Sequence, residues 1–172
     1  MQFLSNVSHL LLLIAAATSA SALPTTTDST SALAARGYSA SGAETRYCLW
    51  PSRWNVCNKA KGHANEALTA AQQNFPAATL HNGKGDAFRH CYWNARMTVD
   101  MGKDTAKTFA DLHEEGGDGP AAEKEMDLAN NASGRQFGEE AKNGGGGNDD
   151  KYGRALTKCK NAANSGALKV LG

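Results

Sequence analysis

The sequence lacks the features that mark several specialised classes of protein. Neither sign of charge is in excess, since 18 Lys and Arg residues stand against 17 Asp and Glu residues, for a formal net charge of +1. This balance argues against a dedicated nucleic-acid binder, whose contact face usually carries a strong excess of Lys and Arg. No apolar run approaches the ~20 residues that cross a bilayer. Over 172 residues, with 20% charged and 41% hydrophobic residues, the composition is that of a single globular domain.

Charged side chains are also missing from residues 1–22, which contain no Lys, Arg, Asp or Glu. Residues 10–17 form an apolar run, and Ala20-Ser21-Ala22 follows as a signal-peptidase site. This pattern predicts a cleaved signal peptide over residues 1–22 and a secreted, extracellular protein. Residues 23–46 are rich in Ser, Thr and Ala and are predicted to be a flexible tail or a propeptide. Residues 47–172 are then the folded domain.

Four cysteines lie in the predicted mature chain, an even number that predicts two disulfides in a secreted protein. Three pairings are possible. We favour Cys48–Cys57 as a local loop and Cys91–Cys159 as a long-range link to the C-terminal region. A zinc site is the weaker interpretation, because no Cys-x-x-Cys or Cys/His cluster occurs at ligand spacing.

Apolar and Ala positions recur at helical spacing and are interrupted by Gly and Pro, which predicts five helices. No alternating run of strand length stands out beyond residue 46. The expected fold is therefore all-α, a compact single domain of about five helices with two disulfides. Asp86 is expected to cap the second helix and Gly102 to end it. The five predicted ranges are 54–75, 86–101, 105–115, 121–142 and 149–163.

Three polar segments could carry chemistry. Asp86, His90 and Asn94 share one helix face at i, i+4 and i+8, and an acid one turn before a histidine can orient the imidazole. His113 and Glu114 end the next helix, where a partly desolvated carboxyl could act as a general acid.

The third segment contains Asp127, Asn130 and Asn131. One of the two asparagines should point into the core, where it needs hydrogen-bond partners. Together the three segments place Asp, His, Asn and Glu on successive helices, which is typical of an active site. The alternative for each is structural: a helix cap, a buried core histidine, or a solvated acidic helix end.

These residues also resemble a known domain. The run Asp86-Ala-Phe-Arg-His90-Cys-Tyr-Trp93-Asn94, followed by His113-Glu114, Met126-Asp127-Leu-Ala-Asn130-Asn131 and Gly134-Arg135, resembles a small α-helical domain of secreted fungal proteins and bacterial toxin C-termini. Its fungal members include the muramidases of glycoside hydrolase family 184. The resemblance covers roughly residues 48–170. It implies an antibacterial hydrolase that cleaves β-1,4 glycosidic bonds of bacterial peptidoglycan.

Under this interpretation the site is built from carboxylates. Glycoside hydrolysis usually needs an acid and a second carboxylate. We assign Glu114 as the acid, positioned by His113 and Asn130, with Asp86 or Asp127 as the second carboxylate and His90 beside them. The expected substrate-binding residues are Arg89, Trp93, Asn94, Asn130, Asn131 and Arg135.

The resemblance also sets expectations about partners. We expect bacterial peptidoglycan as substrate, no metal or other cofactor, no nucleic acid, no membrane anchor, and a monomer. The near-neutral charge counts against a lysozyme, since many of these enzymes are basic. Three alternatives stay open: a secreted phospholipase A2-like enzyme, a metal-dependent hydrolase using His90, His113, Asp86 and Asp127, and a non-enzymatic secreted effector. The phospholipase is disfavoured because Cys91 stands where its aspartate would lie.

Overall fold

A computed structural model describes residues 38–117 and 119–171. Over these residues the protein is all-α and contains no strand, which confirms the predicted fold class. The predicted signal peptide and residues 23–37 lie outside the described residues. The α-helices are α2 (Gly42–Tyr47), α3 (Trp54–Asn74), α4 (Lys84–Met101), α5 (Lys103–Glu115), α6 (Ala121–Asn143) and α7 (Asn148–Ser165), with 3₁₀ turns at Pro51–Arg53 and Ala77–Thr79.

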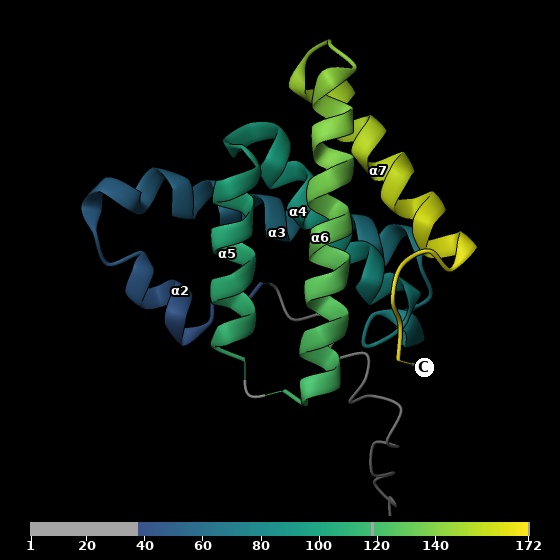
Figure 1. Cartoon of the computed structure of the whole chain (residues 1–172), viewed down its shortest axis with the longest axis horizontal. Coiled ribbons are helices and arrows are strands. Elements are labelled where there is room, and N and C mark those ends of the chain that lie inside the picture. The colour runs from purple at the N-terminus through teal and green to yellow at the C-terminus, as the bar shows by residue number, and fades with distance from the viewer. Residues whose placement is uncertain (1–37, 118, 172) are drawn as a thin grey trace, which may run out of the picture.

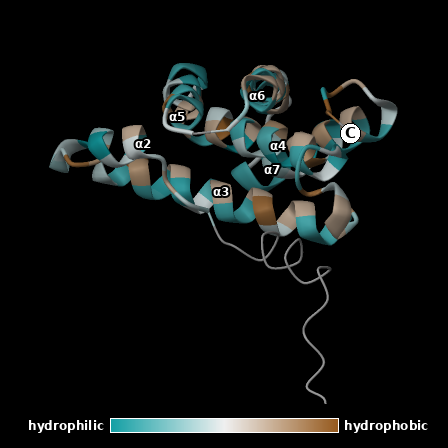
Figure 2. Ribbon diagram, turned by 90° about the horizontal axis from the view of Figure 1, so that it is seen from below, coloured by the Kyte–Doolittle hydropathy of each residue, from teal (hydrophilic) through white to brown (hydrophobic). Residues whose placement is uncertain are grey.

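Helix α4 is the centre of the fold. It contacts α3, α5, α6 and α7, and most of its residues are buried. Figure 1 shows α5 and α6 running side by side, and Figure 2 shows them above α4 with α3 below it. The core that α4 organises is made largely of alanine and aromatic side chains. Small side chains let the helices pack closely around α4, which carries most of the candidate site.

Glycines in α6 allow this helix to approach α4 closely. A Cβ atom added at Gly134 would lie 2.1 Å from the carbonyl oxygen of Cys91, and one at Gly138 would lie 2.7 Å from that of Ala95. Only glycine therefore fits at either contact without displacing α6. This crossing brings the polar residues of α6 up to those of α4.

The predicted helix boundaries agree closely with the observed ones, but the predicted cap of α4 is wrong. Gly83 is the N-cap residue, and because glycine has no side chain, α4 begins without a side-chain cap. Asp86 instead lies in the first turn, where its Oδ2 accepts a hydrogen bond from the backbone N–H of Asn82 at 2.7 Å. Asp86 is 3% exposed, so its carboxylate faces the interior. Gly102 ends the helix as predicted.

Both favoured disulfides are present. Cys48–Cys57 closes the loop between α2 and α3, and Cys91–Cys159 links α4 to α7. Two disulfides are compatible with a secreted protein. Within the described part of the chain, no helix combines the length and the apolar character that a membrane span requires.

The end of the predicted tail is structured. Residues 42–46 belong to α2, which packs against α5, and the Ser41 hydroxyl donates to the carbonyl of Leu112 at 2.7 Å. This helix was not predicted, and it makes six α-helices within residues 38–171 where five were expected. Whether the residues before it form a tail or a propeptide stays a prediction.

Candidate functional site

The site is centred on His90, a side chain 2% exposed in the middle of α4. Two carboxylates face its Nε2 atom: Asp127 Oδ1 at 3.3 Å and Asp86 Oδ1 at 3.5 Å. A third, Glu114 Oε1, lies 3.7 Å from Nδ1 on the other side of the ring. Helices α4, α5 and α6 thus each supply a carboxylate to one buried imidazole, and the sequence had singled out all four residues.

Burial and the neighbouring Arg89 together set the protonation of His90. Its guanidinium donates to Asp86 Oδ1, from Nη2 at 2.5 Å and from Nε at 3.2 Å. Nη2 also lies 2.6 Å from His90 Nε2. Because a guanidinium can only donate, we assign Nε2 as the acceptor and the ring proton to Nδ1, which faces Glu114. Burial, followed by the charge of Arg89, holds the pKa of His90 well below its usual value, so the ring is neutral at pH 7.

The carboxylates differ in their affinity for a proton. Burial, and then the charges of Asp86 and Glu114, raise the pKa of Asp127 to about 8. Burial also raises the pKa of Glu114. Burial would raise the pKa of Asp86 too, but the charge of Arg89 and the hydrogen bonds from Arg89 and the Asn82 backbone outweigh it and lower the value. At neutral pH Asp127 is therefore the protonated carboxyl and Asp86 the ionised one.

The geometry around Asp127 favours the same protonation. Its Oδ1 is buried and has no hydrogen-bond partner among the described residues. His90 Nε2, 3.3 Å away, presents a lone pair, which would repel an ionised carboxylate and suits a protonated one. Asp127 is also 15% exposed, and neighbouring Arg89 is 28% exposed, so the cluster reaches solvent at this edge.

Behind His90 lies a buried network of amides. Asn131 Nδ2 donates to Glu114 Oε1 at 3.2 Å, and Asn131 Oδ1 accepts from Asn94 Nδ2 at 2.6 Å. Arg135 Nη1 donates to Asn94 Oδ1 at 3.1 Å. These residues are each less than a tenth exposed. The network therefore holds Asn131, which orients the Glu114 carboxyl from the interior side. Asn94, Asn131 and Arg135 were expected to bind substrate, but they lie in this interior network.

Two other predicted residues have different partners from those expected. Asn130, expected to position Glu114, pairs instead with the backbone of Lys169, as donor and acceptor at 2.9 Å each. Asn130 therefore holds the C-terminal segment in place. Asn131, rather than Asn130, is the residue that positions Glu114. Trp93, expected to bind substrate, is 2% exposed and donates its indole N–H to the carbonyl of Ala60 at 3.0 Å.

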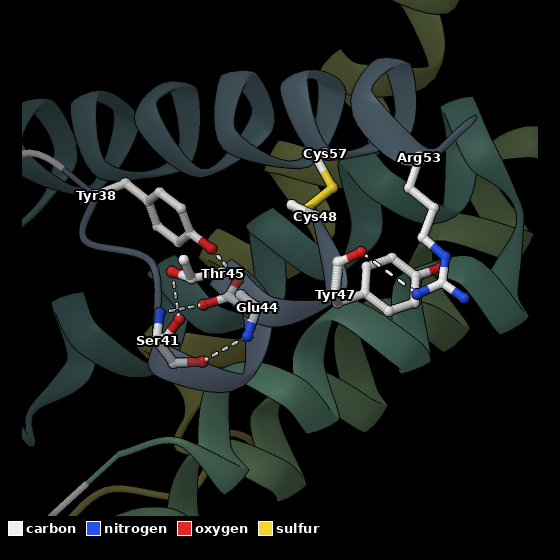
Figure 3. The surroundings of a disulfide bond; sticks show 8 residues. All are labelled: Tyr38, Ser41, Glu44, Thr45, Tyr47, Cys48, Arg53 and Cys57. Carbon is white, nitrogen blue, oxygen red and sulfur yellow. Dashed lines mark hydrogen bonds between the residues drawn. A yellow bond between two sulfur atoms is a disulfide. The ribbon is translucent and has the colours of Figure 1, made fainter. Parts of the chain in front are cut away.

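His113 belongs to a second cluster that sequence reasoning missed. Its Nδ1 lies 2.9 Å from Glu44 Oε2, and the Tyr38 hydroxyl donates to the other carboxylate oxygen. Tyr38 also stacks on the His113 ring. Figure 3 shows the backbone N–H of Ser41 donating to Glu44. Although Glu44 is buried, these hydrogen bonds outweigh the burial and lower its pKa. The capping pattern Ser41-x-x-Glu44 was the available signal, but it marks a helix start rather than a buried pair.

A metal ion is the one cofactor that the cluster could hold. Asp86, His90 and Asp127 each offer a ligand atom, and the three atoms lie within 4.8 Å of one another. These ligand types suit zinc or magnesium. However, the Arg89 guanidinium already contacts two of the three groups. A metal would therefore have to displace a resident cation.

The comparisons with known proteins identify a family without a known activity. No solved structure matches the chain. One family model matches residues 47–167, and its description is a domain of unknown function, DUF6973. The match spans the whole region from the end of α2 to the end of α7, including every carboxylate around His90. The chain belongs to the DUF6973 family.

Proposed function

We propose that this protein is a secreted peptidoglycan hydrolase of the muramidase type, which cleaves β-1,4 glycosidic bonds of the bacterial cell wall. The observation that supports it best is the gathering of Asp127, Asp86 and Glu114 around His90, where burial raises the pKa of Asp127 to about 8 and Arg89 lowers that of Asp86. Glycoside hydrolysis needs one carboxyl that keeps its proton near neutral pH and a second carboxylate. We propose peptidoglycan as the substrate because the three polar segments resemble those of fungal muramidases.

In this proposal Asp127 is the acid. Its proton passes to the glycosidic oxygen as the bond between that oxygen and the anomeric carbon breaks. The larger rise in pKa, the unpartnered Oδ1 and the greater exposure all favour Asp127 over Glu114, the acid expected from the sequence. Glu114, oriented by Asn131, becomes the second carboxylate, which either activates a water or attacks the anomeric carbon.

Asp86 then acts as a positioning residue. Its oxygens are engaged by Arg89 and by the backbone N–H of Asn82, which leaves them poorly placed to reach substrate. Its negative charge raises the pKa of Asp127 and so maintains the proton that the reaction uses. Arg89 holds Asp86 ionised and keeps His90 neutral.

A second candidate function is a metal-dependent hydrolase, which the Asp86, His90 and Asp127 cluster favours. In that case these three residues would hold the metal, and the metal would supply a polarising charge. EDTA distinguishes the candidates, because carboxylate catalysis survives chelation and metal catalysis does not.

Paired variants test the proposal. Asp127→Asn and Glu114→Gln should each reduce clearing of purified peptidoglycan by about a hundredfold or more, with the helical circular-dichroism spectrum retained. Asp104→Asn and Glu115→Gln are matched controls, because both side chains are exposed and lie outside the cluster. If Asp127→Asn stays active, Asp127 is not the acid. If both cluster variants stay active, the glycosidase is not at this site.

A further inference from the structure

An exposed apolar tip lies at the end of the molecule formed by the turn between α2 and α3. Leu49, Trp50 and Trp54 are 70%, 64% and 58% exposed and are the most exposed large apolar side chains in the described residues. Figures 1 and 2, which view the molecule at right angles, both place this turn at the extreme end of the molecule, beyond α5. Large apolar side chains that gather at a projecting turn mark a candidate interaction surface.

The tip has a fixed shape. The Cys48–Cys57 disulfide closes the loop at its base, and the Arg53 guanidinium stacks 4.1 Å from the centre of the Tyr47 ring (Figure 3). Arg53 also donates to the carbonyl of Tyr47 at 3.3 Å. Because these contacts tie the two sides of the loop together, the apolar side chains stay presented to solvent.

The segment that forms the tip carries only positive charges in its sequence. Residues 45–65 contain Arg46, Arg53, Lys59 and Lys61 and no Asp or Glu, although the whole chain is nearly neutral. Lys59 pairs with Asp100 at 3.1 Å. The other three cations have no carboxylate partner among the described residues. The surface around the apolar side chains therefore complements a negatively charged partner.

We propose that this tip binds anionic lipid bilayers, with Leu49, Trp50 and Trp54 entering the headgroup boundary and the cations facing the lipid phosphates. Tryptophan is enriched at this boundary, and basic residues beside apolar ones are typical of peripheral membrane binding. A projecting tip that includes leucine suits a bilayer better than a sugar, which usually binds in a concave site with converging polar groups. Three side chains are also too few for a stable dimer interface, which needs ~800 Å² from each copy.

Vesicle binding by the whole secreted protein tests the proposal. The protein should sediment with phosphatidylglycerol vesicles at low salt and much less with phosphatidylcholine vesicles. Its tryptophan fluorescence should shift to the blue, because two of the three tryptophans are exposed in the free protein whereas Trp93 is already buried. The double variant Trp50→Ala/Trp54→Ala should weaken binding about tenfold or more. Arg46→Gln/Lys61→Gln should weaken it severalfold and reduce its salt dependence.

The matched control is Val170→Ser/Leu171→Ser, which removes the other exposed large apolar side chains and should leave vesicle binding unchanged. Two results would overturn the proposal: no binding to anionic vesicles at low salt, or binding that the tryptophan variant does not weaken. If this variant instead loses binding to purified peptidoglycan while the wild type ignores vesicles, the tip is a glycan platform. Vesicle sedimentation and tryptophan fluorescence do not depend on hydrolysis, so they test membrane binding independently of the muramidase activity.

Discussion

The close crossing of α4 and α6 makes a quantitative prediction about Gly134. Its Cα faces the backbone of Cys91 so closely that an added Cβ would lie 2.1 Å from the carbonyl oxygen, 2.8 Å from the carbonyl carbon and 2.9 Å from Cα. All three neighbours are backbone atoms of Cys91, whose side chain forms the disulfide with Cys159. The clash therefore cannot be relieved by rotating a side chain, and α6 must move.

Gly134→Ala separates the helices by roughly 1 Å, which forfeits a quarter to a half of the dispersion energy across the contact. Overpacking of this kind costs about 3 kcal/mol. Alanine's better helix propensity returns about 1 kcal/mol. The free energy of unfolding should therefore fall by about 2 kcal/mol. The shift also moves Asp127 and Asn131 away from α4, so activity should fall further than stability alone explains.

Guanidinium unfolding with the disulfides intact measures this loss. Gly62→Ala in α3 and Gly153→Ala in α7 are matched controls, because a Cβ at either helical position meets nothing within 4 Å. Each control should gain about 1 kcal/mol from propensity. If Gly134→Ala behaves like these controls and stabilises the protein, then α6 does not approach α4 as described.

Three further predictions concern the site and its scaffold. The raised pKa of Asp127 contributes stability that is present below pH ~4 and is lost as the pH rises through about 8. The melting temperature of Asp127→Asn should therefore rise relative to that of the wild type between pH 5 and pH 8. A difference that stays constant over this range would contradict the raised pKa. Asn131→Ala should lower activity by releasing Glu114, whereas Asn130→Ala should lower mainly stability by freeing the C-terminal segment; equal effects in activity and melting assays would refute this division. Removing the Cys91–Cys159 disulfide, which spans 68 residues, should cost about 4 kcal/mol, against about 2.5 kcal/mol for the nine-residue Cys48–Cys57 loop; chemical unfolding that finds the local disulfide more important would contradict loop-closure entropy as the main term.

Much of the fold follows from local patterns in the sequence. Glycine and proline mark the helix ends, and helical spacing of small and apolar residues marks the helices between them. The even cysteine count predicted two disulfides and left three pairings open, and the structure contains the favoured one. Asp86 was wrongly predicted to cap α4, because the sequence does not show whether an acid near the start of a helix points to the helix end or into the interior.

The candidate site was only partly predictable, because its geometry depends on how the helices cross. Spacing could place His90 with Asp86 on one face, since both belong to α4. It could not choose between Asn130 and Asn131, which are adjacent and both buried, because that choice depends on the rotation of α6. Glu44 was missed because its partners, His113 and Tyr38, are brought together only by the docking of α2 on α5.

The most direct test of the proposed function is mass analysis of the fragments released from purified peptidoglycan by the secreted protein, with and without EDTA. We expect new reducing ends on muramic acid, unaffected by EDTA, with a rate that falls above pH about 8 as Asp127 loses its proton. Intact peptidoglycan would contradict a muramidase. Hydrolysis that EDTA abolishes would move the chemistry to a metal held by Asp86, His90 and Asp127.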